Sequence, residues 1–533
     1  DFHPEYRLEP ELLEDLRKGA IGASERYVIQ VFERGLHQKT AVAEHIVRLG
    51  GTIDQLYPEL RLFQATMTPA QLVSVAARDE VLFVQRRTER SGDMDLVRVF
   101  SGADYLEAQT GFSGQGVQGE ITDSGLDLAH PDFQHNGGVL EHGPVAPMGG
   151  HGTAVTGIVF ADGGGSPEAR GLLPSGRIVF ADWNFPVLGR PAYADELVDP
   201  SLPYKCVFQA NSWGMASTPF YNAFSAEMDD IIFDTDLIIL NSMSNNGNQL
   251  ARPEAWAKNI IGVGGITHFN TATTDDDLWT TASIGPAADG RIKPDLAHFD
   301  DGIWTTYPVS SGSYGLMNGT SAATPIAAGH FGLFFQMWHN NVFHSDPTGT
   351  TPFESKPHYE TAQAAAINTS IPWSFSGTTA NLTRVHQGFG AINVDNLYQL
   401  RDKTVWRDRE LISNLETKSY AIDVAPGETL LKVTMVYRDL PGNPGFLPHR
   451  INDITLRVTS PGGNNYFGNN GLDVGNVSTE GGLPNDLDTK ENVWITSPQA
   501  GTWTVAVFGA DINSDLYPAL PGNNADFSLC DGV

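Results

Sequence analysis

The sequence predicts an α/β protein with a doubly wound, mainly parallel sheet at its centre, a ferredoxin-like α+β domain before it and an antiparallel β-sandwich or jelly roll after it. Three observations lead to this fold class. Residues 1–93 have the order strand, helix, strand, helix, strand. From residue 95 to about 400, short apolar strands alternate with small-residue helices. After residue 404, strands recur between Gly, Pro and Asn, almost without helices. The predicted domains are therefore residues 1–93, 94–403 and 404–533.

The first domain is predicted from the spacing of its apolar residues. Apolar and polar residues alternate across 61–67, as in a half-buried strand. Thr68 supplies a capping hydroxyl for the helix that follows, and Pro69 suits the first turn of that helix. The expected elements are strands at 27–32, 61–67 and 81–84, with helices at 40–49 and 68–78. The sequence shows no catalytic motif in this domain.

In the central domain, ligands are expected at the carboxyl ends of the strands, as in other open α/β sheets. Its strands are predicted at 117–121, 177–181, 207–210, 237–240 and 260–264, with helices at 152–160 and 225–233. In the third domain, strands are predicted at 419–424, 429–437, 453–459, 491–495 and 503–508.

The composition indicates a globular, acidic protein. Hydrophobic residues make up 41% of the 533 residues, the net charge is −30 and the isoelectric point is about 4.7. A surface this acidic repels nucleic acid and anionic membranes, so neither is expected as a partner. There is also no apolar run of about 18 residues that would predict a transmembrane helix. Cys206 and Cys530 form either one long-range disulfide or two buried thiols.

Three reactive side chains stand on Gly-flanked turns of the central domain. Asp123 ends a strand, His151 opens a helix of small residues, and Ser321 begins an apolar helix whose first turn Pro325 would suit. Singly, each is an ordinary turn or helix cap. Together they fill three roles, because a serine hydroxyl needs a base, histidine is such a base near neutral pH, and a carboxylate orients the imidazole. The combination predicts nucleophilic catalysis.

These motifs and their order resemble those of the subtilisin-like serine proteases, the subtilases. The family's signature segments fall on Asp123-Ser124-Gly125, His151-Gly152-Thr153 and the seven residues 319–325. Residues 211–214 and 290–295 also resemble family segments. The resemblance implies a serine endopeptidase in which Ser321 attacks the peptide carbonyl, His151 is the base and Asp123 orients it.

A fourth catalytic group, the oxyanion donor, is expected after the strand at 237–240. This strand runs into an Asn-rich turn, and a side-chain amide there suits the oxyanion of a tetrahedral intermediate. The family pattern, laid without gaps, puts the donor on Asn245, with Ser244 where the family has glycine. A second register puts it on Asn248, after Gly247. We favour Asn245 because it keeps the strand length.

The resemblance also implies how substrate and the flanking domains act. A polypeptide substrate would lie as an extended strand beside Ser212, Trp213 and Gly214, with Trp213 walling an apolar subsite. Residues 1–93 resemble a propeptide that assists folding and inhibits the site as an intramolecular partner, until it is cleaved near residues 92–95. Residues 404–533 resemble the P-domain of proprotein convertases.

Calcium, in a structural role, is the metal that the sequence suits, because acidic loops at 275–277 and 485–488 offer oxygen ligands. Neither loop has the spacing of a defined calcium motif, and the catalysis itself needs no cofactor.

The N-terminus lacks a signal-peptide pattern, so the protein is either cytoplasmic or already processed. The resemblance favours a secreted zymogen. The alternative is a catalytically silent scaffold that keeps its propeptide. A carbohydrate-binding β domain has little support.

Overall fold

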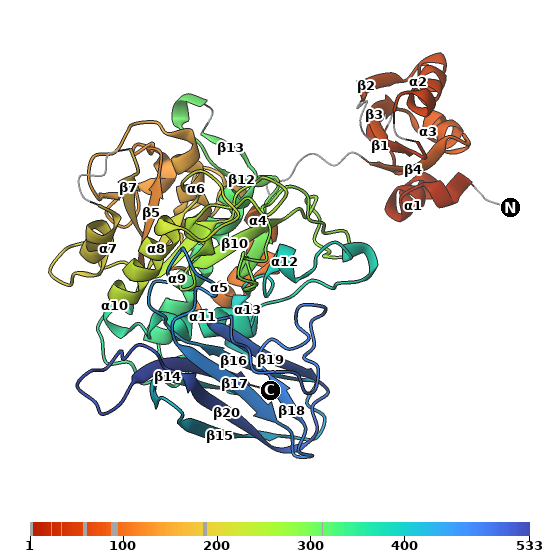
Figure 1. The fold of residues 1–533 in the computed structure, drawn as a ribbon. Coiled ribbons are helices and arrows are strands. Elements are labelled where there is room, and N and C mark those ends of the chain that lie inside the picture. The colour runs from red at the N-terminus through yellow and green to blue at the C-terminus, as the bar shows by residue number, and fades with distance from the viewer. Residues whose placement is uncertain are drawn as a thin grey trace. The chain divides into compact units, whose positions relative to one another are not determined.

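The computed structural model describes residues 4–532 except 23, 34, 57–60, 87–93, 185–188 and 312. The chain divides into two compact units, Asp1–Ser91 and Gly92–Val533, each with its own hydrophobic core (Figure 1). Among the described residues, no helix has both the length and the apolar character that a membrane span needs.

The first unit is a four-stranded antiparallel sheet with the strand order β2-β3-β1-β4. Alternate residues of β1 and β3 are fully buried, which is the pattern expected of half-buried strands. Thr68 and Gln71 form a capping box at the start of α3. The elements are α1 (Pro10–Lys18), β1 (Glu25–Val31), α2 (His37–Arg48), β2 (Thr52–Leu56), β3 (Leu62–Met67), α3 (Pro69–Ala76) and β4 (Val81–Arg86).

The sequence pattern does not predict two elements of this unit, α1 and β2. Strand β2 lies at the sheet edge, pairs only with β3 and contains polar residues such as Asp54, so its apolar alternation is weak. Helix α1 contributes one fully buried residue, Leu12, to the core and is otherwise rich in charged side chains.

A seven-stranded parallel sheet forms the centre of the second unit, which confirms the predicted sheet class. The strand order is β11-β10-β9-β8-β5-β7-β6, and all neighbours are parallel. The strands are β5 (Gln118–Asp123), β6 (Leu140–Glu141), β7 (Arg177–Asp182), β8 (Phe208–Asn211), β9 (Ile238–Ser242), β10 (Ile261–Ile266) and β11 (Leu296–Phe299).

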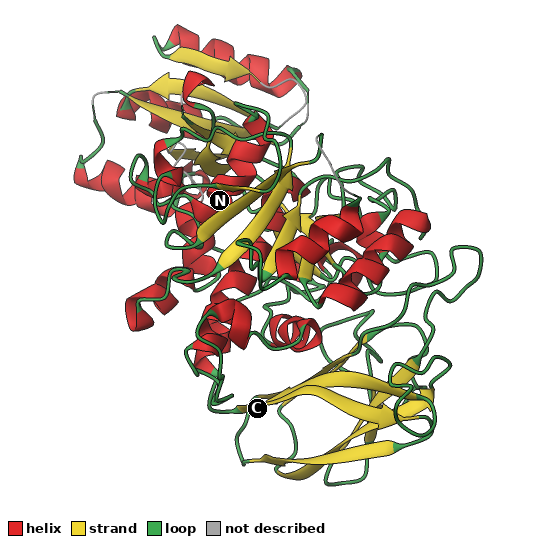
Figure 2. Cartoon of the chain, turned by 90° about the vertical axis from the view of Figure 1, so that its left-hand side faces the viewer, coloured by secondary structure: helices red, strands yellow, loops and turns green. Residues whose placement is uncertain are grey.

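Helices cover both faces of this sheet (Figure 2). Phe208 faces α9, because a Cβ on Gly332 of that helix would lie 3.2 Å from the Phe208 ring. The next residue, Gln209, faces the other side and lines a cavity with residues of α7 and α8. The helices are α4 (Met94–Phe100), α5 (Ala103–Thr110), α6 (Gly150–Phe160), α7 (Arg190–Val198), α8 (Ala223–Thr235), α9 (Thr320–His339), α10 (Pro352–Ser355), α11 (Tyr359–Asn368), α12 (Arg384–Gln387) and α13 (Val394–Gln399).

Helix α9 is buried at every residue from Ala322 to Trp338. The antiparallel strands β12 (Ile303–Thr306) and β13 (Tyr314–Met317) lead into it. Pro325 lies inside the helix rather than in its first turn, so the predicted position of this proline is wrong. A proline there removes the N–H that would otherwise donate to the carbonyl of Ser321, four residues earlier.

Two four-stranded antiparallel sheets make up the chain from Thr404 onward, and their facing side chains form a separate core. The strand orders are β14-β21-β16-β19 and β15-β20-β17-β18. The sequence pattern does not predict β14, β18 or β21; in β14 a register shift between Arg407 and Glu410 breaks the alternation. The strands are β14 (Thr404–Ser413), β15 (Thr417–Val424), β16 (Leu430–Val436), β17 (Asp453–Thr459), β18 (Asn465–Phe467), β19 (Lys490–Thr496), β20 (Gly501–Asp511) and β21 (Asn524–Gly532).

Cys206 and Cys530 are free and buried, so of the two alternatives the disulfide is wrong. Cys206 belongs to the main core, and Cys530 packs with Val436 and Ala364. Burial raises the pKa of both thiols well above the ordinary value, which makes them poor nucleophiles.

The β domain packs on the α/β body through α11, which contacts β14, β16 and β21 (Figure 1). Polar contacts cross this interface. The Arg409 guanidinium lies 2.9 Å from the carboxylate of Glu360 in the first turn of α11. The Asn368 amide at the end of the helix donates to Thr434 Oγ1 at 3.2 Å.

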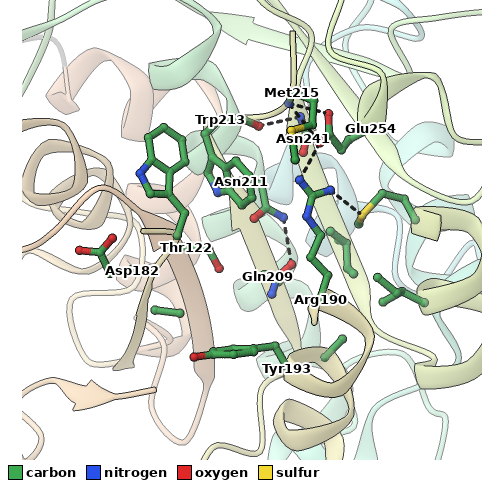
Figure 3. Close-up of a pocket in the computed structure, with 16 residues that line it drawn as sticks. Thr122, Asp182, Arg190, Tyr193, Gln209, Asn211, Trp213, Met215, Asn241 and Glu254 are labelled. Atoms are coloured by element: carbon green, nitrogen blue, oxygen red, sulfur yellow. Dashed lines mark hydrogen bonds and ion pairs between the residues drawn. The ribbon is translucent and has the colours of Figure 1, made fainter. Parts of the chain in front are cut away.

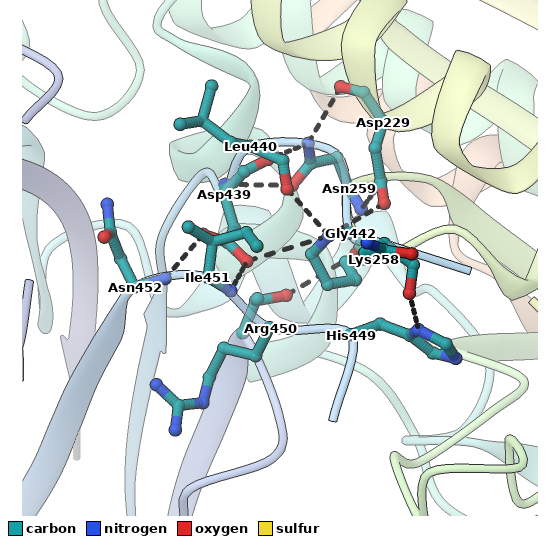
Figure 4. A network of polar contacts seen from close by, with 12 residues as sticks. Asp229, Lys258, Asn259, Asp439, Leu440, Gly442, His449, Arg450, Ile451 and Asn452 are labelled. Carbon is teal, nitrogen blue, oxygen red and sulfur yellow. Dashed lines mark hydrogen bonds and ion pairs between the residues drawn. The ribbon is translucent and has the colours of Figure 1, made fainter. Parts of the chain in front are cut away.

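A second polar crossing is a buried network around Lys258 (Figure 4). The Lys258 ammonium donates to Asp229 of α8 at 3.0 Å and to the Leu440 carbonyl of the β domain at 2.8 Å. The Asp439 carboxylate lies 3.7 Å away, and all three charged side chains are fully buried. Asn259 adds a hydrogen bond from its amide to the Asp439 carbonyl at 2.8 Å. Because Lys258 and Asp439 each have partners from both domains, removing either one leaves a buried charge without compensation.

We expect Lys258→Met to lower the free energy of unfolding by about 3–5 kcal/mol, because Asp229 and Asp439 would remain buried without their cation. Urea unfolding followed by tryptophan fluorescence measures this, since all ten tryptophans lie after residue 92 and report on the second unit.

The matched control is Lys418→Met, which removes a partly exposed pair with Glu410 at 3.2 Å. That change should cost no more than about 1 kcal/mol. Equal losses in the two variants would contradict a compensating role for Lys258.

Candidate active site

The carboxylate of Asp123 and the imidazole of His151 are in direct contact. Asp123 ends β5 and is fully buried, while the His151 side chain in the first turn of α6 is 40% exposed. His151 Nδ1 lies 2.7 Å and 2.9 Å from the two carboxylate oxygens. Gly152 permits this approach, since a Cβ there would lie 2.1 Å from the Gly125 carbonyl oxygen. With Nδ1 engaged by Asp123, the other ring nitrogen, Nε2, is the one that can accept a proton.

Opposing effects set the pKa of His151. Burial lowers the pKa by disfavouring the imidazolium, while the hydrogen bond and the negative charge of Asp123 raise it. The two contributions of Asp123 together outweigh burial, and the pKa lies above its ordinary value of 6.5. The positive charge of Arg252 acts in the lowering direction. At pH above this raised pKa the imidazole is neutral and can accept a proton.

Ser321 is held against the segment that follows β8. Because Pro325 has no N–H, the Ser321 carbonyl lacks its helical donor, and the Ser212 hydroxyl donates to it at 2.9 Å. In return, the Ser321 hydroxyl donates to the Ser212 carbonyl at 3.2 Å. Gly319, just before the helix, has φ 86°, a left-handed conformation that favours glycine. This reciprocal pair sets the position of the hydroxyl.

Of the three expected catalytic side chains, Asp123 and His151 are joined by a hydrogen bond. Ser321 is brought near them by the packing of two helices. Helices α6 and α9, which carry His151 and Ser321, pack against each other. Within the described part of the chain, however, the Ser321 hydroxyl is bonded to Ser212 and not to His151. Nucleophile–base hydrogen bonds are often long without substrate and tighten in the complex, so this arrangement is compatible with that pairing.

Asn245 lies against the turn that carries Ser321. The Thr320 N–H and hydroxyl donate to Asn245 Oδ1 at 2.9 Å and 3.1 Å. A Cβ on Gly319 would lie 2.8 Å from Asn245 Nδ2. Oδ1 is occupied and Nδ2 has no hydrogen-bond partner within the described ranges, so the amide has a free donor on the side of Gly319, two residues before Ser321.

Asn248, the rival donor, is engaged within its own turn, where its Oδ1 accepts the Leu250 N–H at 2.8 Å. Ser244 has φ 104°, a strained conformation for any residue but glycine. Its N–H donates to Thr320 Oγ1 at 3.3 Å, and its carbonyl accepts the Ser283 N–H at 2.6 Å. These contacts hold the backbone in the conformation that directs the next residue towards Thr320.

A cavity of about 190 Å³ lies beside Trp213, on the sheet face covered by α7 and α8 (Figure 3). Trp183 meets Trp213 edge to face, with 4.9 Å between ring centroids. The Arg190 guanidinium lies 4.8 Å from the Trp213 ring, and Tyr193 closes the wall formed by α7. Mainly apolar walls of this size suit one large side chain.

Charged side chains that no sequence motif predicts hold the end of the expected substrate strand. Glu254 accepts the Met215 N–H with both carboxylate oxygens, at 3.1 Å and 3.2 Å, and the Arg190 guanidinium at 2.8 Å. Arg252 donates to the Gly214 carbonyl at 3.0 Å. Arg252 and Glu254 lie where the chain enters the short 3₁₀ helix Glu254–Trp256, and only the tertiary structure shows what the two side chains face.

The acidic loops expected to suit calcium are engaged within the protein. Asp488 accepts the Ile292 N–H at 2.8 Å and two asparagine amides. Asp277 accepts the Trp373 indole N–H at 2.6 Å. Within the described ranges, no three His, Cys, Asp or Glu side chains are grouped so as to hold a metal ion.

Comparison with known proteins places this site in a defined family. A sequence model described as the Subtilase family matches residues 114–391, which is 278 of 533 residues. Serine protease AprX of Bacillus subtilis (strain 168) is 23% identical over 363 residues, covering 58% of this chain and 78% of that protein. The Thermophilic serine proteinase of Bacillus sp. (strain AK1) is 22% identical over 260 residues, covering 45% and 57%.

Other matches cover a smaller part of the matched protein or are to a solved structure. Tripeptidyl-peptidase 2 of Oryza sativa subsp. japonica is 26% identical over 199 residues, which cover 34% of this chain and 15% of that protein. This chain thus matches a small part of the rice protein and little over half of the proteinase from strain AK1. The solved structure titled "Structure of Prenylagaramide maturation protease PagA" aligns with a TM-score of 0.42 at 16% identity, over 56% of this chain and 98% of that chain.

We expect Ser212→Ala to lower the free energy of unfolding by about 1–3 kcal/mol, because the Ser321 carbonyl would be left without a donor. Pro325→Ala returns a helical N–H to that carbonyl. Ser212→Ala should therefore cost less in the Pro325→Ala background, as measured by urea unfolding of the four chains of a double-mutant cycle.

A cost of Ser212→Ala that is the same in both backgrounds, within about 0.5 kcal/mol, would show that the two residues do not share this carbonyl.

Proposed function

The chain belongs to the subtilase family, and from this premise we propose that it is a serine endopeptidase that hydrolyses polypeptides and is made as a propeptide-inhibited zymogen. The observation that carries the proposal is the contact of the Asp123 carboxylate with His151 Nδ1 at 2.7 Å, in a domain whose buried helix α9 presents Ser321 at its start. The curated relatives that carry "serine protease" or "serine proteinase" in their names support the same activity.

In this proposal His151 Nε2 takes the proton of the Ser321 hydroxyl as Oγ attacks the substrate carbonyl carbon. The tetrahedral intermediate then collapses, the peptide C–N bond breaks, and His151 gives its proton to the leaving amine. Water hydrolyses the resulting acyl-enzyme by the same route, with His151 again as the base. Asp123 keeps Nδ1 protonated and stabilises the imidazolium.

Two donors are proposed for the oxyanion of the intermediate: the free Nδ2 of Asn245 and the Ser321 backbone N–H. The N-terminal end of α9 adds a favourable partial positive charge. Because Thr320 fixes the other end of the Asn245 amide, this donor is oriented before substrate binds.

A polypeptide substrate is proposed to lie as an extended strand beside Ser212, Trp213 and Gly214. The cavity beside Trp213 would receive an apolar side chain of that strand. Glu254 supports this mode, because its hydrogen bonds to Met215 and Arg190 hold the end of the segment in place.

Residues 1–93 are proposed to be a propeptide that is removed by the enzyme itself. The separate core of the first unit suits a segment that is released whole. Of the candidate cleavage region, 92–95, residues 92 and 93 lie outside the described residues. Met94 is fully buried at the start of α4, and Arg98 donates to the Gly171 carbonyl at 2.6 Å. Cleavage before Met94 would leave these contacts intact.

The alternative, a silent scaffold with a retained propeptide, is weaker because side chains for all four catalytic roles are present. A serine-directed fluorophosphonate separates the two. We expect it to label Ser321, and we expect purified protein to carry a new N-terminus at or just before Met94. The Ser321→Ala variant should show neither and should keep residues 1–93.

Absence of labelling and of peptide hydrolysis, even after the first unit has been removed by an added protease, would favour the scaffold.

Asn245→Ala should lower kcat by about 10²–10³-fold with a small change in KM, as for loss of one oxyanion donor in related enzymes. The matched control is Asn248→Ala, one turn away and equally exposed, which should keep nearly full kcat. Initial rates on a quenched peptide, normalised to phosphonate-titrated sites, give both values. A larger loss in Asn248→Ala would reverse the assignment.

A further inference from the structure

Arg252 spans the two segments that flank Ser321. Its backbone N–H donates to the Met243 carbonyl, two residues before Asn245, at 3.0 Å. Its guanidinium donates to the Gly214 carbonyl at 3.0 Å and approaches the Met215 carbonyl at 3.4 Å. The side chain lies so close to the strand that a Cβ on Gly214 would be 3.0 Å from Arg252 Cδ. The cation therefore closes the space between the substrate strand and the oxyanion turn.

The charge of Arg252 has no counter-ion in the part of the chain that the structure describes: no carboxylate there lies within 4.0 Å of the guanidinium. The nearby Glu254 is already committed to Arg190 and to the Met215 N–H. Arg252 Nε is buried and has no hydrogen-bond partner among the described residues. A guanidinium has five N–H donors, and two carbonyl oxygens leave several of them unused.

We propose that Arg252 is a specificity-determining residue that binds a carboxylate of the substrate, so that the enzyme cleaves after aspartate or glutamate. The inference rests on the proposed endopeptidase function. In this proposal the substrate carbonyl lies between Ser321 and Asn245, and the substrate chain runs beside Gly214. The side chain of the same substrate residue then points between these two segments, where Arg252 lies. A carboxylate there meets unused N–H donors and an uncompensated positive charge.

This subsite differs from the cavity beside Trp213. That cavity has mainly apolar walls, and Arg190, the one cation among its described lining residues, is paired with Glu254. The space near Arg252 presents an unpaired cation close to the reacting groups, and its charge acts on His151. The two sites would select different side chains of one extended substrate, an acidic residue at the scissile bond and an apolar residue elsewhere.

The test uses quenched peptides that differ only at the residue before the scissile bond: Glu, Gln, Leu or Lys. We expect the mature wild type to prefer Glu to Gln by about tenfold or more in kcat/KM, the size expected for a hydrogen bond to a charged group. Arg252→Gln should bring this ratio close to one. Arg252→Lys should keep a preference for Glu, and Arg252→Glu should favour Lys.

Each ratio is measured on one preparation, so incomplete folding of a variant cancels. The control Lys418→Gln makes the same change in net charge as Arg252→Gln, but on the β domain, and should leave the wild-type ratio unchanged. If the wild type showed no preference for Glu, or if Arg252→Gln kept the wild-type ratio of kcat/KM for the Glu and Gln peptides, the proposal would be wrong. Arg252 would then only support the Gly214 carbonyl. Absence of cleavage of every peptide, together with absence of phosphonate labelling, would instead overturn the proposed function.

Discussion

The site depends on a carbonyl group that its own helix cannot satisfy. Pro325 denies the Ser321 carbonyl its donor within α9, and Ser212 supplies one from the end of a neighbouring strand. The reverse bond, from the Ser321 hydroxyl to the Ser212 carbonyl, closes the pair. A missing backbone hydrogen bond thus becomes a tertiary link that ties the nucleophile to the strand proposed to hold the substrate.

The surrounding charges are arranged around the same strand. Glu254 and Arg252 satisfy its last N–H and carbonyl groups from one short segment, residues 252–254, and Arg190 stacks on its tryptophan. The charges of Glu254 and Arg190 compensate each other in an ion pair. The charge of Arg252 is compensated by neither of these side chains. In a protein with a net charge of −30, such a cation is a localised feature rather than part of a basic surface.

Motifs and periodicity predicted the features that are local in sequence. The five predicted central strands follow from continuous apolar runs, and Asp123 lies at the end of β5 while His151 and Ser321 lie in the first turns of α6 and α9. The pattern missed polar edge strands such as β2 and the interrupted β14. Arg190, Arg252 and Glu254 also carry no sequence signal, because their roles depend on contacts between segments distant along the chain or on tertiary geometry. The choice between Asn245 and Asn248 likewise needed the Thr320 contact.

The buried network around Lys258 bears on how such a chain can evolve. A lysine of the α/β body is compensated partly by Asp439 and the Leu440 carbonyl, which belong to the β domain. Recombination that exchanged the β domain for an unrelated one would leave the buried Lys258 ammonium without these acceptors, unless the new domain placed matching acceptors at the same positions. The two domains are therefore expected to be inherited together, and a chimaera would need this interface transferred along with the sheets.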